Sequence, residues 1–294
     1  MTARTARPAG RRTAVLAAAA LAVARSAAAQ SFPAQPGAYL LSATATDARA
    51  LWVNPAILRN SPEASIGADL TATLTDGGLE LSQLGLTLAS RGLAFGWSRT
   101  EAPGAAPAGS LPAINTFALG FGLGDEVLSA GVARRWYRGT RKASAWELGA
   151  RTRWRRGVEL SLVWRDIGSP VVSPYRPLVA ADTTLPARLV PGVGLLLFGG
   201  RLRLGAEWEA TRGSVTRVAR AGFAWQLTDR IAVMGRGDLS SRPEHRSLAV
   251  AAQWRVRSAR ATLYTAQPDL GDSQDLGAAL QLFALPPPVR GRRP

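Results

Sequence analysis

A few side chains in the sequence have the types that catalysis or metal binding would need. The single histidine, His245, lies in SSRPEHRS, and three acidic residues, Asp269, Asp272 and Asp275, lie close together in PDLGDSQD. A hydrolase would place the histidine beside a nucleophilic serine, but the motif GxSxG is absent. The acidic stretch has oxygen ligands for Ca²⁺, although acidic loop residues are mostly just hydrated. We therefore predict no catalytic residues, no metal site and no cofactor.

Charged side chains recur instead at every second position of several segments, which places them on one face of a strand. In RLRLGAEWE the apolar residues alternate with charged ones, and GVELSLVWR and SAWELGARTRWR repeat the pattern. The charged faces comprise Glu147, Arg151, Arg153, Glu159, Arg165, Arg201, Arg203, Glu207 and Glu209. Buried charges persist mainly as pairs, so we expect these residues to pair across strands and form the wall of a lumen. Contact with a substrate is the alternative interpretation.

Strands with one charged face and one broad apolar face do not suit a water-soluble sandwich, because one face would meet the wrong solvent. A barrel in a membrane accommodates both faces. We predict an all-β fold, a transmembrane antiparallel β-barrel of about 14 strands, an even number as in bacterial outer-membrane barrels. The expected strands are residues 64–74, 80–90, 92–100, 114–123, 127–138, 143–155, 157–166, 186–198, 201–210, 214–226, 230–239, 246–257, 260–267 and 274–283.

The connections and the tryptophans agree with this topology. Tight turns such as SRG, GDE and TDR alternate with long stretches at residues 101–113 and 167–185, and in such barrels the short turns are periplasmic. The outer strand ends then carry Trp97, Trp136, Trp146, Trp164 and Trp208, and the inner ends carry Trp154, Trp225 and Trp254. Two tryptophan girdles are typical of the two membrane interfaces.

Residues 1–29 have the pattern of a secretory signal peptide, with a basic start, the apolar core AVLAAAALAVA and small residues before the expected cleavage site. The chain has 0 cysteines, so disulfides are excluded and we expect no lipoprotein anchor. Removal of the leader takes away five arginines and lowers the formal charge from +16 to +11. The remaining arginines are scattered over the strands, so we expect no nucleic-acid partner.

The octet LWVNPAIL, residues 51–58, carries a helix-start signal just before the first expected strand. Asn54 suits an N-cap and Pro55 suits the first helical position, so Ala56 to Arg59 are expected to form one helical turn. In the simplest interpretation this is a capped turn that packs Leu51, Trp52, Ile57 and Leu58 against the barrel wall.

The segment TDARALWVNPAILRNSPEASIGADL resembles the N-terminal region of the FadL/TodX hydrophobic-compound channels and of the related PorV/PorQ-type barrels, which carry an Asn-Pro-Ala segment before the first strand. LPARLVPGVGLLLFGGRLRLGAEWE also resembles a hairpin of the PorV-type branch. The resemblance implies that residues 30–63 form a plug, with Asn54, Pro55 and Ala56 at its gate, followed by a barrel at residues 64–283.

Two functions remain open on this resemblance. One is binding or passage of a small hydrophobic compound, and the other is a non-transport, PorV/PorQ-type accessory barrel in protein secretion or surface attachment. The expected location is the outer membrane of a Gram-negative-type bacterium, where lipid and lipopolysaccharide would surround the barrel.

Two local features refine the expected barrel. TFALGFGL turns Thr116, Ala118, Gly120 and Gly122 inward, which would leave room for a ligand beside the charged wall. Pro191 lies within ARLVPGVG, and because proline cannot donate a ladder hydrogen bond we expect a kink or a bulge there. The resemblance suggests that such an irregularity opens the wall sideways. The alternative is that the proline is a tolerated defect near the start of a strand.

The last strand, QDLGAALQLF, is expected to close the barrel against the first one, since an unpaired edge in lipid is costly. In this register Leu276, Ala278, Leu280 and Leu282 face lipid and Phe283 faces the other side. Residues 284–294, ALPPPVRGRRP, cannot continue a strand because of their prolines. We expect them to form a disordered basic tail in the periplasm.

Overall fold

The computed structural model describes residues 40–43, 45, 47–60, 64–75, 78–101, 113–154, 157–173, 182–211, 218–240, 247–267 and 274–284. Among these residues no helix is long and apolar enough to cross a membrane. The expected signal peptide, His245, Asp269, Asp272 and residues 285–294 lie outside the described residues.

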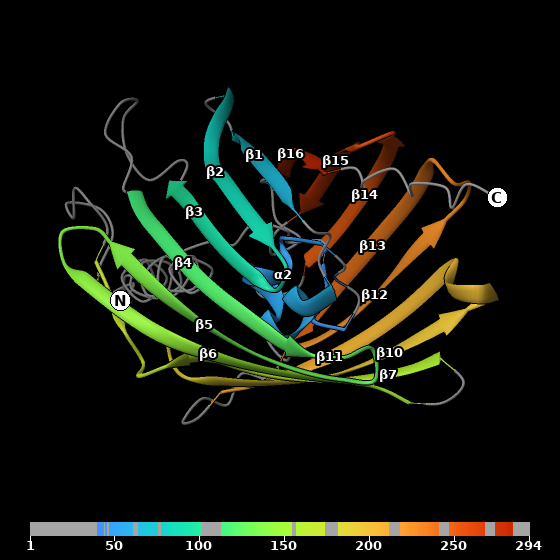
Figure 1. Cartoon of the computed structure of the whole chain (residues 1–294). Coiled ribbons are helices and arrows are strands. Elements are labelled where there is room, and N and C mark those ends of the chain that lie inside the picture. The colour runs from blue at the N-terminus through green and yellow to red at the C-terminus, as the bar shows by residue number, and fades with distance from the viewer. Residues whose placement is uncertain are drawn as a thin grey trace, which may run out of the picture. The chain divides into compact units, whose positions relative to one another are not determined.

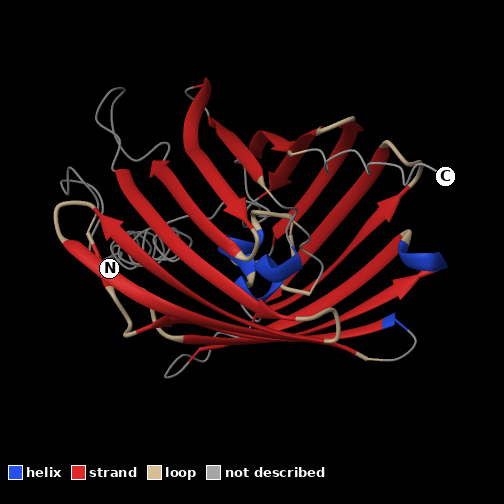
Figure 2. Cartoon of the chain, in the orientation of Figure 1, coloured by secondary structure: helices blue, strands red, loops and turns tan. Residues whose placement is uncertain are grey.

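Most of the described residues belong to one closed antiparallel β-barrel (Figures 1 and 2), with strand order β1-β16-β15-β14-β13-β12-β11-β10-β7-β6-β5-β4-β3-β2. Its 14 strands confirm the predicted fold class. They are β1 (Ser65–Thr75), β2 (Gly78–Ser90), β3 (Leu93–Glu101), β4 (Ala113–Gly124), β5 (Leu128–Arg138), β6 (Lys142–Arg153), β7 (Val158–Ile167), β10 (Arg188–Leu197), β11 (Leu202–Thr211), β12 (Val218–Gln226), β13 (Ile231–Ser240), β14 (Ser247–Val256), β15 (Ala259–Gln267) and β16 (Gln274–Phe283).

The remaining elements are short. Two helical turns, α2 (Ala50–Val53) and η1 (Pro55–Asn60), precede the first strand, and η3 (Phe198–Gly200) lies in the turn between β10 and β11. The strands β8 (Val171–Val172) and β9 (Thr183–Thr184) pair with each other inside the long connection expected near residues 167–185.

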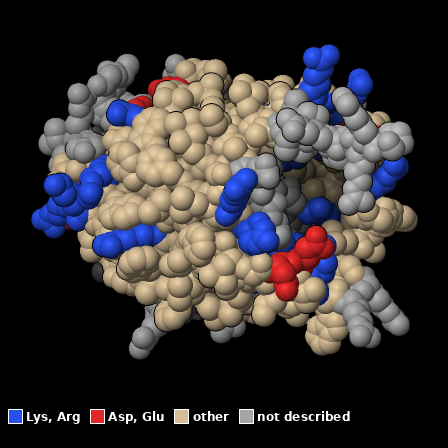
Figure 3. Space-filling model, in the orientation of Figure 1, with Lys and Arg blue, Asp and Glu red and all other residues tan. Residues whose placement is uncertain are grey.

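Period-two alternation decides which way each side chain points, and the burial of the strands follows it. In β6 buried and exposed residues alternate from Ala145 to Ala150, and in β11 from Gly205 to Ala210. The outward set is mostly apolar and includes the eight predicted girdle tryptophans, whereas the inward set is mostly polar, small or charged. Broad uncharged areas on the visible face fit this pattern (Figure 3).

The barrel closes where the sequence predicts, because β16 pairs with β1 from Ser65 opposite Phe283 to Leu74 opposite Gln274. Leu276, Leu280 and Leu282 are exposed on the outer face. Phe283 faces the opposite way, and the Arg260 guanidinium lies 4.9 Å from the centroid of its ring. The closing strand and its register are therefore confirmed.

Candidate functional site

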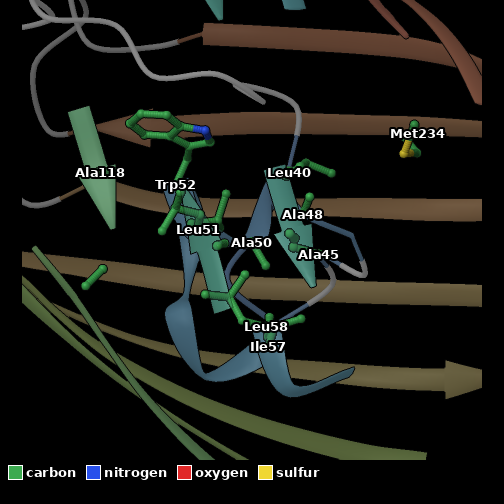
Figure 4. Packing of buried hydrophobic residues seen from close by; sticks show 14 of the residues in the cluster. Leu40, Ala45, Ala48, Ala50, Leu51, Trp52, Ile57, Leu58, Ala118 and Met234 are labelled. Carbon is green, nitrogen blue, oxygen red and sulfur yellow. The ribbon is translucent and has the colours of Figure 1, made fainter. Parts of the chain in front are cut away.

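The described residues of the segment 40–60, which are 40–43, 45 and 47–60, lie inside the barrel, and α2 is at its centre (Figure 1). Residues 50–58 are buried without exception, with Leu51, Trp52, Ile57 and Leu58 each at most 1 % exposed. These side chains form one cluster with wall residues such as Ala118 and Met234 (Figure 4). The contact of the octet with the barrel wall is thus as predicted.

Asn54 connects the two helical turns of the segment. Its backbone N–H donates to the carbonyl of Ala50, 2.7 Å away, which ends α2. Its side-chain oxygen accepts a hydrogen bond from the N–H of Ala56 at 3.0 Å, so the predicted N-cap is present. Its side-chain amide donates to the carbonyl of Ser42. The sequence does not predict α2, because a single turn of four residues has no detectable periodicity.

Glycines of the barrel wall make room for this segment. A methyl group at Gly131 would lie 2.3 Å from the carbonyl carbon of Pro55, and one at Gly149 would lie 2.2 Å from the side-chain oxygen of Asn54. Only glycine allows such an approach of two backbones. We name five wall residues with this property, on β3 to β6, the glycine bed: Gly96, Gly120, Gly122, Gly131 and Gly149.

The glycine bed corrects one expectation. Gly120 and Gly122 face inward as predicted, but the space beside them is filled. Leu51 would be 2.5 Å from a methyl group at Gly120, and the carbonyl oxygen of Pro55 would be 2.8 Å from one at Gly122. A glycine in a sequence is compatible with an empty cavity or with a close contact, and here the contact is present.

Two arginines of the wall bind the carboxyl end of α2. Arg135 donates to the carbonyl of Trp52 at 3.0 Å and to Glu147 at 2.8 Å, and its guanidinium lies 5.5 Å from the Trp52 ring centroid. Arg165 donates to the carbonyl of Val53. Terminal carbonyls of a helix have no partner within it, and they favour cations. We call Arg135, Glu147 and Arg165 the arginine clamp.

An irregularity in β7 orients Arg165, one member of this clamp. The register of β6 against β7 shifts between Trp146 and Leu148, so Arg165 and Asp166 both lie opposite Glu147. Asp166 has a φ of +52°, in the left-handed region that a non-glycine residue adopts at some cost. This bulge lets Arg165 reach the segment while Asp166 accepts hydrogen bonds from Tyr137 and Arg188.

A chain of ion pairs continues around the inner wall from Asp166. Arg188 bonds to Asp166 and Glu209, Arg220 bonds to Glu209, Glu207 and Asp238, and Arg236 bonds to Asp238. Two of these residues also bind the segment: Glu207 accepts from the N–H of Ser42 at 2.8 Å, and Arg236 donates to the carbonyl of Leu40 at 3.1 Å. The alternation pattern of the sequence contains Arg135, Arg188 and Arg220, but they were not among the predicted wall residues.

The other predicted wall residues differ in their positions. Arg151 and Arg153 both bond to Glu159, at 2.5 and 2.8 Å. Arg203 is partly buried on the inward side of β11, and no ion pair joins it to a carboxylate within the described part of the chain. Arg201 is exposed in the turn before β11, so its assignment to the lumen wall was wrong: the strand begins one residue later.

A second charged group lies within the segment. Asp47 forms a two-point contact with Arg49 and also accepts from Arg260 of β15 at 3.3 Å. Burial raises the pKa of Asp47 to about 6, against the opposing influence of Arg260. Burial likewise lowers the pKa of Arg49 to about 10.

Pro191 produces a gap in pairing instead of a bulge. The register of β10 against β7 runs without interruption through Pro191 opposite Leu162. Against β11 the pairing stops after Leu189 and resumes at Gly192 in the same register. The proline lacks the N–H for a ladder bond, so the wall loses pairing there without a shift.

Asp275, the described member of the acidic triplet, accepts a hydrogen bond from Thr73.

No protein-family model matches the chain, and no curated protein matches it either. Several solved structures are similar to it in fold. The Ralstonia pickettii toluene transporter TbuX aligns at 13 % identity with a TM-score of 0.54, over 85 % of this chain and 98 % of that one. A TodX monoaromatic hydrocarbon channel with a deltaS2 mutation aligns at 12 % identity and a TM-score of 0.55, over 81 % and 95 %.

A FadL homologue of Pseudomonas aeruginosa gives 12 % identity and a TM-score of 0.51, over 87 % of this chain and 97 % of that chain. The chain shares its fold with outer-membrane channels. At these identities the likeness concerns the fold, and the function has to be argued from the residues inside the barrel.

Proposed function

We propose that the protein is an outer-membrane channel that binds or passes small hydrophobic compounds, and that residues 30–63 form its plug, in which residues 40–60 fill the lumen. The observation that carries this proposal is an apolar segment seated in the lumen on the glycine bed. Asn54 and the first two residues of η1, Pro55 and Ala56, contact Gly131 and Gly149, so we assign the gate to them.

An apolar part of the wall supports a hydrophobic substrate. The cluster that includes Leu51 and Trp52 extends beyond the glycine bed to residues of β13, β14 and β15, among them Met234, Ala249 and Ala251. Movement of the plug would leave this strip for an apolar compound to contact. The similar structures named above include a toluene transporter and a monoaromatic hydrocarbon channel, which favours the same substrate class.

The paired charges have a structural role in this proposal. Glu147, Glu159 and Glu209 each bond to an arginine of the wall, so they are not offered to a polar substrate. The accessory-barrel alternative gains no support from the similar structures, and the PorV/PorQ part of the resemblance remains a prediction.

The gap beside Pro191 suggests a sideways exit for the substrate. The two unpaired positions, Val190 and Pro191, lie between β10 and β11, where backbone groups would otherwise close the wall. Just inside, Ser42 lies against Gly192, where it would be 3.0 Å from an added methyl group. We propose that displacement of residues 40–43 uncovers this gap, so that the compound leaves into the membrane.

A disulfide can test whether the plug has to move. A Cβ atom at Gly194 would lie 3.4 Å from that of Ala43 in the plug and 3.5 Å from that of Glu159 in the wall, distances near those of about 3.5–4.5 Å in disulfides. We expect Ala43→Cys/Gly194→Cys to stop uptake of labelled toluene into cells when oxidised and to restore it when reduced. Because the chain has 0 cysteines, no other thiol competes.

The matched control is Gly194→Cys alone, which has no second thiol to bond with and leaves the plug free. It should take up toluene in both redox states. Unimpaired uptake through the oxidised plug-to-wall variant would contradict the proposal.

The setting of the protein follows from the same proposal. Residues 1–29 would direct export, residues 30–63 would form the plug and residues 64–283 the barrel in the outer membrane of a Gram-negative-type bacterium. Lipid and lipopolysaccharide would surround the apolar outer face.

A further inference from the structure

The outer face of β3 to β6 carries a row of polar and cationic side chains at the end nearest the longer loops. The strand register aligns four outward residues across the four strands: Arg99 is opposite Asn115, Asn115 opposite Arg138, and Arg138 opposite Lys142. Lys and Arg atoms gather at the left of the molecule in Figure 3, where Figure 1 places the end of the β5–β6 hairpin.

An aromatic row lies directly below these cations. Two residues further into the membrane, Trp97 is opposite Phe117, and Phe117 is opposite Trp136. One pleat repeat separates the rows by about 7 Å. Tryptophan prefers the boundary between lipid tails and headgroups, so the cations above it are at the level of the headgroups.

Arg134 lies at the apolar side of this boundary. It faces outward on β5 directly opposite Trp146, and its guanidinium lies 5.0 Å from the Trp146 ring centroid and 5.4 Å from that of Trp136. Its Nε is buried and has no hydrogen-bond partner. The two indoles therefore hold the guanidinium in place and leave its polar edge unsatisfied.

The cations of this face are short of carboxylates. Arg99 bonds to Glu101 at 2.7 Å, and Arg141 in the adjoining turn lies 3.4 Å from Asp182. Within the described residues, no ion pair joins Arg134, Arg138 or Lys142 to an acidic side chain. Three cations at a membrane boundary with no acidic partner among the described residues favour contact with anionic headgroups.

We propose that this face, with Arg134, Arg138 and Lys142, binds the phosphates of a glycolipid headgroup in the outer leaflet. Phosphate groups accept bidentate hydrogen bonds from arginine, and the acyl chains would lie along the apolar outward residues below Arg134, such as Leu93 and Phe121. The longer loops place this end of the barrel in the outer leaflet. The site is on the opposite side of the wall from the plug, so it is independent of the channel function.

The test measures retention of bisphosphorylated lipid A by the full-length protein in detergent, using native mass spectrometry. Arg134→Gln/Arg138→Gln/Lys142→Gln should bind it about tenfold more weakly or worse, as expected for the loss of charge-assisted hydrogen bonds. The control, Arg201→Gln/Arg230→Gln/Arg257→Gln, removes the same charge from exposed arginines in short turns at the other end. It should bind like the unaltered protein.

Further measurements separate binding from folding and from simple anion attraction. Both triple variants should keep the heat-dependent gel shift of a folded barrel, and Arg134→Lys should bind at an intermediate level because it keeps the charge but not the planar donor. Dephosphorylated lipid A should bind poorly, and excess inorganic phosphate should not displace bound lipid A. Wild-type retention by the first triple variant, equal binding of dephosphorylated lipid A, or displacement by phosphate alone would each overturn the proposal.

Discussion

The inner wall of the barrel holds residues 40–60 in two different ways. On β3 to β6 the wall has glycines, which have no side chain and so allow a close approach. Gly131 admits the backbone of Pro55, and Gly149 admits the side chain of Asn54. From β5 round to β13 the contact is made by long charged side chains that reach the segment's main chain. A substitution of the wall residues weakens the first contact by adding atoms and the second by removing charge.

The two contacts also differ in what they recognise. The charged residues bind main-chain groups of Leu40, Ser42, Trp52 and Val53, which every sequence supplies. The glycine bed instead fits particular side chains, Leu51 and Trp52 among them. The charged contacts therefore fix the path of the segment, and the glycine bed selects its residues.

Loss of the clamp should have the largest effect on stability. Arg135→Met leaves Glu147 buried at 0 % exposure without its 2.8 Å ion pair, and breaking such a pair costs about 3–5 kcal/mol. We expect this loss in the free energy of unfolding in detergent, together with faster hydrogen exchange at residues 50–58. Arg135→Met/Glu147→Met should lose less, because no charge is left unpaired. An equal or larger loss in the double variant would argue against the clamp.

The docking of residues 40–60 should depend on pH through Asp47, which is a side chain of this segment. Its pKa is raised from 3.8 to about 6 when the segment is docked, so between these values the docked form binds the proton and the released form does not. Docking is therefore tightest below about pH 4 and weakens as the pH rises through about 6, by at most about 3 kcal/mol. Denaturant-induced exposure of residues 40–60 should follow this dependence. Asp47→Asn should remove it, and a dependence of opposite sign would contradict the assignment.

A single methyl group should disturb the glycine bed. Gly131→Ala puts a carbon 2.3 Å from the Pro55 carbonyl carbon, and overpacking of this kind costs about 1–3 kcal/mol. We expect higher ion conductance in planar bilayers as the segment is displaced. Gly67→Ala is the matched control, since the nearest atom to its new methyl group is 3.8 Å away. Equal conductance of the two variants would show that the glycine contact does not hold the segment.

The sequence predicts the barrel much better than its contents. Alternation with a period of two identifies each strand by itself, as in Leu202–Thr211, and the requirement for closure then fixes Gln274–Phe283 as the partner of β1. The cap at Asn54 is also local, because its partner Ala56 is two residues away. Such features need no knowledge of distant residues.

The features that the sequence did not predict depend on residues far apart in the chain. Gly131 and Gly149 carry no side chain to mark a contact, and their partners Asn54 and Pro55 are more than 70 residues away. Arg165 is aimed by a bulge that alternation treats as an ordinary strand position. The pairing gap at Pro191 was expected as a kink, because the sequence does not reveal on which side the missing N–H falls.

The smallest expected effect concerns a single hydrogen bond where the two kinds of contact meet, at Trp52. Its indole N–H donates to the hydroxyl of Thr87 at 2.9 Å, while its ring fills the position opposite Gly96. Trp52→Phe removes the bond and keeps an aromatic ring, so docking should weaken by about 1 kcal/mol. Thr87→Val leaves the buried N–H without this acceptor and should cost about 1–3 kcal/mol. Hydrogen exchange at residues 50–58 measures both. If Thr87→Val costs no more than Trp52→Phe, shape alone holds the tryptophan, and the glycine bed needs no polar partner at this point.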